Sequence, residues 1–180
     1  MKAYKVRPAS NELPYKFETG TQNHEGIAGL LGALEYFEWI GKEFAGPQGD
    51  SLRDKYSGRR LTFKQALTLT RAYEFELSRA LIEAISSVPG TQIHGLTDLK
   101  RLEERVSTVS FTLKGKDPRR IAEELAEAGI YVWDGNYYAL AVTERLGLED
   151  KGGMVRIGAA HYNTLEEVAR FGDVLKNITN

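Results

Sequence analysis

Apolar residues recur at helical spacing in two stretches of the N-terminal half of the chain. The first stretch begins after Asn23, a residue type that commonly caps helices. Its apolar positions are Ile27, Leu30, Leu31, Leu34 and Phe37. The second stretch runs from about Arg59 to Ser87, carries one long apolar stripe and ends at Pro89-Gly90. The pattern predicts two long helices, separated by a glycine-containing loop over residues 45–58 that we expect to be exposed and mobile.

The periodicity changes in the C-terminal half. Apolar and polar residues alternate over residues 109–113, as in a half-buried strand, and apolar runs at 130–133 and 154–158 predict two more strands. A short helix is expected to start at Asp117-Pro118, because aspartate caps helices and proline suits their first turn.

The last helix should open at Thr164, since Glu167 three residues later completes a capping box. Helices lying on one face of a small, mostly antiparallel sheet would bury all of these apolar positions. We therefore expect an α+β fold with two long helices in front. The expected division is a lead-in, first helix and loop over residues 1–58, followed by a small α+β domain over residues 59–180.

Composition narrows the range of functions. The formal net charge is −1, which gives no indication of a nucleic-acid or anionic-membrane partner. No apolar run approaches the roughly 20 residues needed to span a bilayer, and the polar N-terminus lacks the apolar core of a signal peptide. The chain has no cysteine, which excludes thiolate chemistry, and its three histidines lack zinc-site spacing. No metal site is expected, and a cytoplasmic location is the default.

The stretch from Phe17 to Asn23 is the first candidate for chemistry. Gly20 and Thr21 form a turn directly before the first predicted helix. Backbone N–H groups at a helix N-terminus, a hydroxyl and the positive end of the helix dipole together suit a phosphate. From the residues alone, simple capping of the helix explains the same pattern and is the commoner arrangement.

Arg156 is the second candidate. It lies on the strand predicted at 154–158, on the opposite face from Val155 and Ile157, and small residues follow it. A guanidinium in such surroundings could bind a carboxylate with two parallel hydrogen bonds. A solvated arginine or a structural salt bridge is the alternative.

The third candidate is the polar, aromatic turn at the end of the strand predicted at 130–133. Asp134-Gly135 marks the turn and Asn136 follows it, at a position where binding groups are common, so Asn136 is a candidate substrate-binding residue. Packing explains the neighbouring aromatic residues equally well. His161, which follows the Arg156 strand, could orient a carboxylate or could be structural.

These stretches occur together in an order that resembles the C-terminal part of class V aminotransferase-fold enzymes. The residues that carry the resemblance are FETGTQN before a helix and GMVRIGAAHYNT before the final helix. The cysteine desulfurase-like group is most similar, with isopenicillin-epimerase-like and kynureninase-like relatives. The resemblance implies a pyridoxal 5'-phosphate cofactor and a homodimer. It also implies that Gly20 and Thr21 reach the cofactor phosphate in the partner's active site, and that Arg156 binds the α-carboxylate of an amino-acid substrate.

Two departures from that family shape the expectation. The family's cofactor-holding lysine precedes the Gly-Thr turn, and this chain starts only about twenty residues before it. We therefore expect no catalytic residue and no turnover in this chain alone. We expect a C-terminal part that acts in a homodimer or with a complementing N-terminal half.

True desulfurases also use a cysteine on a loop that corresponds here to residues 134–139, where none is present. An aminotransferase, epimerase or lyase activity is therefore as compatible as sulfur transfer. A non-catalytic binding or assembly module, or an unrelated small-ligand binder, is the alternative.

Overall fold

A computed structural model describes residues 1–18 and 20–178 of the chain. It divides into two compact units, residues 1–67 and 68–180, and the division falls inside one long helix, α2 (Gly58–Ser86). That helix had been expected from about Arg59 to Ser87. The sequence-based domain boundary, in contrast, lies between residues 58 and 59, before the helix.

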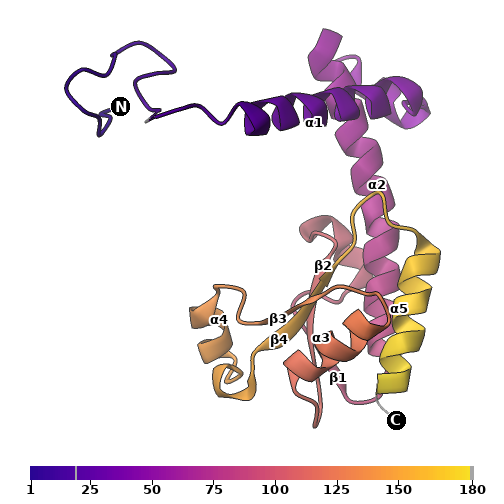
Figure 1. The fold of residues 1–180 in the computed structure, drawn as a ribbon. Helices are drawn as coiled ribbons and strands as arrows, with labels where there is room; N and C mark the ends of the chain where they lie inside the picture. The colour runs from indigo at the N-terminus through magenta and orange to yellow at the C-terminus, as the bar shows by residue number, and fades with distance from the viewer. Residues whose placement is uncertain (19, 179–180) are drawn as a thin grey trace. The chain divides into compact units, whose positions relative to one another are not determined.

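The first unit is built on α1 (His24–Glu43) and the start of α2 (Figure 1). Asn23 caps α1 as predicted, because its side-chain oxygen accepts a hydrogen bond from the Gly26 N–H at 2.8 Å. The backbone of α2 approaches α1 closely at Gly41, where any Cβ would overlap the Thr62 carbonyl. Glycine is therefore what permits the two helices to meet at this point.

The segment between these helices contains more regular secondary structure than the sequence indicated. It contains a 3₁₀ helix, η1 (Pro47–Leu52), in the range that we expected to be a loop without regular structure. The Gln65 side chain is buried and donates a hydrogen bond to the Gly49 carbonyl at 3.3 Å. This contact ties the segment to α2.

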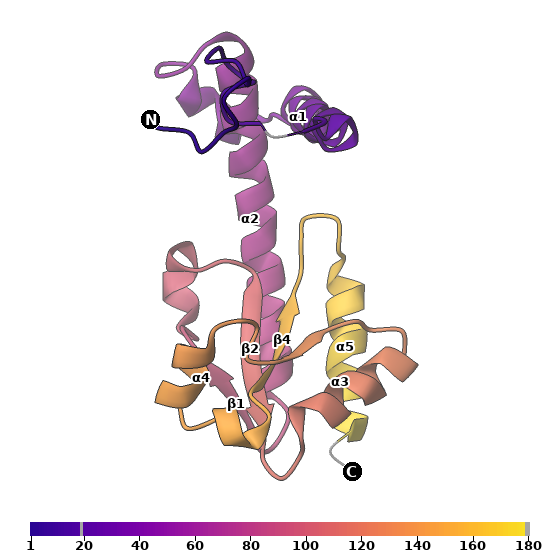
Figure 2. The same ribbon diagram turned by 60° about the vertical axis from the view of Figure 1, so that its left-hand side comes forward.

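The second unit contains a four-stranded sheet in the order β1-β2-β4-β3, whose strands are labelled in Figure 1 and turned into a second view in Figure 2. The strands are β1 (Thr91–His94), β2 (Thr108–Leu113), β3 (Trp133–Gly135) and β4 (Met154–Gly158). All three pairings are antiparallel, and the register sets Phe111 opposite both Ile93 and Val155. The predicted α+β architecture with an antiparallel sheet is confirmed.

Helices cover one face of this sheet. Figures 1 and 2 both show α3 (Pro118–Glu127) and α5 (Leu165–Ile178) side by side, with the C-terminal half of α2 on the same face. The core between them is one cluster of buried side chains, in which the rings of Phe111 and Phe171 meet edge to face. Alternation along β2 places Val109, Phe111 and Leu113 in this core, as the sequence predicted.

Both predicted helix caps in this unit are present. The Asp117 side chain accepts from the Arg119 N–H at 3.0 Å, with Pro118 in the first turn. Thr164 and Glu167 form the reciprocal capping box, each accepting from the backbone N–H of the other. Local sequence therefore determines where α3 and α5 begin.

Other expectations were wrong. The strand predicted at 130–133 lies instead at Trp133–Gly135, because Ile130 and Val132 pack on the core from a segment without strand pairing. The helix α4 (Leu140–Arg145) and the 3₁₀ helices η2 (Leu99–Glu104) and η3 (Glu149–Lys151) were not predicted. The apolar stripe of α2 is also interrupted, since Leu67 is half exposed and the Tyr73 hydroxyl donates to the Asn163 carbonyl. Within residues 1–18 and 20–178, no helix combines the length and apolar character that a membrane crossing needs.

Candidate functional site

Arg156 lies at the centre of the sheet. Strand β4 runs between β2 and β3, and the register places Arg156 opposite Ser110 on one side and opposite Trp133 on the other. Its neighbour Val155 is fully buried in the core, so Arg156 points to the face of the sheet that the helices leave uncovered. The fold thus directs one half-buried cation toward the uncovered face.

Two aromatic rings contact the Arg156 guanidinium. Its central carbon lies 4.9 Å from the centroid of the Tyr137 ring and 5.6 Å from that of Trp133. Among the residues that the structure describes, none accepts a hydrogen bond from this guanidinium or forms an ion pair with it. Its N–H donors are therefore available to an external acceptor, in contrast to Arg105, which donates to three backbone carbonyls.

The loop after β3 brings Tyr137 to this position. Tyr137 and Tyr138 have φ angles of 53° and 61°, in the left-handed region that non-glycine residues rarely occupy. Each such residue costs on the order of 1 kcal/mol or more. The two conformations turn consecutive side chains in different directions. As a result, Tyr137 is half-buried while Tyr138 is 95% exposed.

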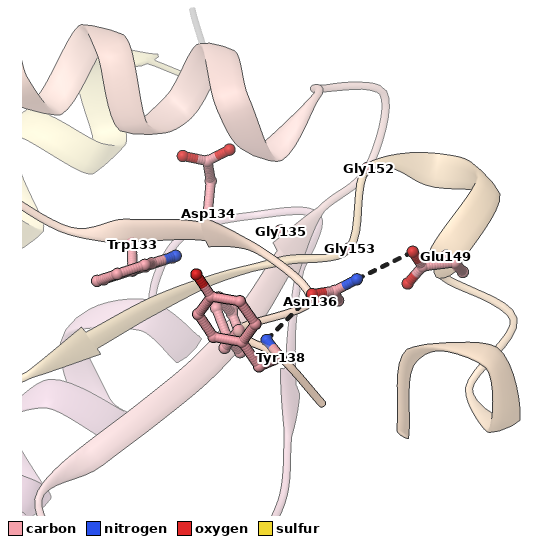
Figure 3. Close-up of a pocket in the computed structure, with 9 residues that line it drawn as sticks. Trp133, Asp134, Gly135, Asn136, Tyr138, Glu149, Gly152 and Gly153 are labelled. Carbon is pink, nitrogen blue, oxygen red and sulfur yellow. Dashed lines mark hydrogen bonds between the residues drawn. The ribbon is translucent and has the colours of Figure 1, made fainter. Parts of the chain in front are cut away.

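Asn136 holds this loop in place. Its side-chain oxygen accepts from the Tyr138 N–H at 3.1 Å, and its amide nitrogen donates to the Glu149 carboxylate at 3.1 Å, as Figure 3 shows. The other oxygen of Glu149 accepts from the hydroxyl of Thr143, which is fully buried. Both ends of the Asn136 amide are thus hydrogen-bonded, one to the loop backbone and one to Glu149 of η3, and the expected contact of Asn136 with substrate stays a prediction.

The Tyr137 hydroxyl is buried and has no hydrogen-bond partner at normal distance among the described residues, although Ser110 is close enough to influence its pKa. Burial raises the pKa of Tyr137 above its ordinary value, although Ser110 and the positive charge of Arg156 oppose that shift. Tyr137 therefore stays neutral under ordinary conditions and presents an uncharged ring to the guanidinium.

A small hollow of about 360 Å³ opens beside this loop. Its lining runs from Trp133 to Tyr138 and includes Glu149 and the Gly152-Gly153 turn. In Figure 3, Asp134 points away from Tyr138, so alternation along β3 separates its carboxylate from the Arg156 side of the sheet. The Gly152-Gly153 turn lies so close to β3 that a Cβ at Gly153 would overlap the Gly135 carbonyl.

His161 lies in the segment that follows β4. Its Nδ1 is 3.4 Å from a carboxylate oxygen of Glu74 on α2, and its ring meets that of Tyr162 edge to face. Nearby, the Asn163 side chain accepts from the Ala160 N–H at 2.9 Å. These contacts fix the segment against α2 and give His161 a partner within the fold.

Gly20 and Thr21 belong to the first unit, whereas Arg156, Asn136 and His161 belong to the second. Gly20 has a φ of +82°, and a Cβ there would meet no atom within 4 Å. Thr21 is exposed. Thr19, in the same motif, lies outside the described residues. The turn thus presents open backbone and a hydroxyl before α1, although the first turn of that helix also contains Glu25.

Sequence reasoning missed the roles of Trp133 and Tyr137 beside Arg156. It left the aromatic residues of this turn, Trp133 among them, open between binding and packing, and it did not single out Tyr137. Strand register could have revealed the position of Trp133. A strand predicted at 133–135 and paired with β4 would have placed Trp133 opposite Arg156. The ring of Tyr137 could not be found in this way, because its position depends on two unusual φ angles.

Comparison with known proteins places this fold in a class. The structure resembles the apo structure of a cysteine desulfurase from Thermococcus onnurineus NA1, with a TM-score of 0.67 and 26% identity over 92% of this chain and 33% of that one. It also superposes on the Escherichia coli cysteine desulfurase CsdA with a TM-score of 0.64, over 92% of this chain and 33% of that one, at 22% identity. The fold is therefore that of part of a type I pyridoxal-phosphate-dependent enzyme.

The sequence defines the family. Residues 58–171 match the family model described as aminotransferase class V, and the chain belongs to that family. It is 32% identical to a probable cysteine desulfurase of Mycobacterium leprae over 92% of this chain and 22% of the relative. It is 29% identical to one of Methanothermobacter thermautotrophicus over 93% of this chain and 34% of the relative. An aminotransferase-like protein of Gibberella zeae is 36% identical over 58% of this chain and 26% of that protein. The chain spans about a third or less of the length of these relatives.

Proposed function

We propose that this chain supplies the C-terminal part of a pyridoxal-phosphate-dependent enzyme that acts on an amino acid, with Arg156 binding the α-carboxylate. The observation that carries the proposal is the half-buried guanidinium on the uncovered sheet face, with no hydrogen-bond acceptor among the described residues. Partial burial of a charge costs free energy unless a partner compensates it. A carboxylate fits, because its two oxygens match two parallel N–H donors.

The residues present also fit the cofactor. Gly20 and Thr21 would hold the phosphate, since an open glycine backbone and a hydroxyl before a helix N-terminus are suitable donors. Pyridoxal phosphate, when bound, supplies the electron sink for chemistry at the amino-acid α-carbon. Arg156 would fix the carboxylate and so orient the α-carbon. We assign Asn136 to positioning the loop beside Arg156, and His161 to positioning the segment after β4.

The reaction that we favour is transamination, epimerisation or lyase chemistry. A sulfur-transfer mechanism with a protein thiolate needs a cysteine on the loop at residues 134–139, and this chain contains none. The similarity to a protein named aminotransferase-like supports this choice.

The partner is a second copy of the protein or an N-terminal half that complements it. Several large apolar side chains of α1 and the residue after it are about half exposed: Ile27, Leu30, Leu31, Trp39 and Phe44. Such a surface supports association with further chain. For the location we propose the cytoplasm, which the cysteine-free composition supports.

Reconstitution tests this function. The chain would be combined with the N-terminal segment of a class V relative, and cofactor uptake would be followed by absorbance. We expect Arg156→Gln to weaken amino-acid binding by about 30- to 100-fold with cofactor uptake unchanged. Thr21→Val should instead weaken cofactor retention by about tenfold.

The matched control is Arg119→Gln, the same change at an exposed arginine on α3, which should alter neither measurement. The proposal fails if the reconstituted protein never takes up cofactor, or if Arg156→Gln binds amino acids as tightly as the unchanged protein.

A further inference from the structure

We propose that Tyr137 is a positioning residue that orients the Arg156 guanidinium for a carboxylate ligand. The inference rests on the proposed function of Arg156 and extends it to a residue with no assigned role. Three observations converge on it: the ring contact, the burial of the phenol, and the unusual backbone of the loop that delivers it.

The ring contact restrains Arg156 without using its donors. An arginine side chain has four rotatable bonds, and holding it in one orientation costs conformational entropy when a ligand binds. A ring 4.9 Å from the guanidinium carbon attracts the cation electrostatically and limits that freedom in advance. Because the ring face is not an oxygen acceptor, the N–H donors remain available to a carboxylate.

Tyr137 is better suited to this role than Trp133. The Trp133 side chain is 54% exposed on an edge strand, whereas the hydroxyl of Tyr137 is buried beside Ser110. Burial of its hydroxyl end leaves the Tyr137 ring less free space than the exposed ring of Trp133 has. Tyr137 therefore forms the more restricted of the two ring contacts.

The loop geometry shows that the ring position is specified. Two consecutive residues adopt left-handed conformations, and Asn136 and Glu149 connect them to the buried Thr143. The result is one tyrosine turned toward Arg156 and the next turned to solvent. A loop needed only to join β3 to α4 would not require this arrangement.

The experiment uses the full chain, combined with the N-terminal segment of a class V relative as in the reconstitution above, and NMR signals of the Arg156 side chain. In the unchanged protein we expect the Nε–H group to show a ring-current shift and an order parameter clearly above that of Arg119, which is exposed on α3. Titration with L-alanine should move the Arg156 signal, and titration with sodium chloride at the same molar concentration should not.

Variants separate positioning from simple packing. Tyr137→Leu should lower the order of Arg156 and weaken L-alanine binding by about 3- to 10-fold, while Tyr137→Phe, which keeps the ring, should change binding less than about twofold. Tyr131→Leu, the same substitution at a tyrosine that is 86% exposed, is the matched control.

The outcomes are distinct. An Arg156 side chain as mobile as Arg119 in the unchanged protein overturns the proposal, even if Tyr137→Leu does not fold. Unchanged L-alanine affinity in a folded Tyr137→Leu variant overturns it as well. An ordered Arg156 that does not respond to L-alanine would support the ring contact and overturn the proposed carboxylate function.

Discussion

The two units of this chain bury their apolar residues to very different extents. In the second unit a single cluster of buried side chains connects the sheet to α2, α3 and α5. In the first unit, Ile40 and Ala66 are the buried apolar side chains among the described residues, while much of α1 is exposed. The same kind of amphipathic sequence is present in both, so helical periodicity alone does not determine how much of a helix is covered.

The contrast has a consequence for stability. Burial of apolar surface is the main favourable contribution to folding, at roughly 25 cal/mol per Å². The second unit therefore has its own source of stability. The first unit depends on helix propensity, the capping of α1 and the close approach at Gly41. Three matched comparisons test this difference, and a pH profile characterises the second unit further.

Truncation of a large side chain should give the largest difference. Phe111 is fully buried and meets Phe171 edge to face, so Phe111→Ala should lower the free energy of unfolding by about 3–5 kcal/mol. Leu31→Ala on α1, at a side chain that is 51% exposed, should change it by less than about 0.5 kcal/mol. Urea denaturation followed by fluorescence and circular dichroism measures both. Equal effects would show that the units do not differ in packing.

Glycine replacement tests close backbone approach in each unit. Gly153→Ala should cost about 2–4 kcal/mol, because its Cβ would overlap Gly135 and because φ is +77°. Gly41→Ala should separate α1 from α2 locally, which hydrogen exchange of the α1 amides would detect without a comparable loss in the sheet. Uniform loss of protection across both units after Gly41→Ala would contradict the distinction.

Helix caps allow a smaller comparison. Thr164→Ala removes one half of the capping box and should cost about 1 kcal/mol of global stability, since α5 is part of the core. Asn23→Ala should instead reduce the helicity of the first turns of α1. Circular dichroism and urea denaturation distinguish the two, and a global destabilisation by Asn23→Ala would count against the comparison.

The smallest expected effect is a pH dependence in the second unit. Burial lowers the pKa of His94 below its ordinary value of 6.5. The unfolded chain therefore binds more protons than the folded one just below pH 6.5, so stability decreases as the pH falls through that value. The lowered pKa values of Glu104, Glu166 and Glu167 act only below about 4.5, outside this window. His94→Gln should flatten the stability profile between pH 7.5 and 5.5, and an unchanged slope would show that His94 is not its source.

Where a few neighbouring residues determine an element, the sequence predicted it well. The strand at 154–158, the Asp117 cap and the Thr164–Glu167 capping box all match the structure. Prediction failed where tertiary contacts decide. The helix α4 presents exposed apolar residues rather than an amphipathic pattern, and Ile130 and Val132 contact the core without strand pairing. In the same way, the sequence located Arg156 but not the ring of Tyr137, which depends on loop conformation rather than on spacing.

The strand order has a consequence for how the protein is made. Strand β4 comes last along the chain but lies between β2 and β3, so β3 has no strand to pair with until residues near 158 have left the ribosome. The β1–β2 hairpin can form earlier, with an open edge where β4 will later insert. Synthesis proceeds at roughly 5–20 residues per second, so that edge stays unpaired for several seconds. Chaperones that bind exposed strands would have their main opportunity in this interval.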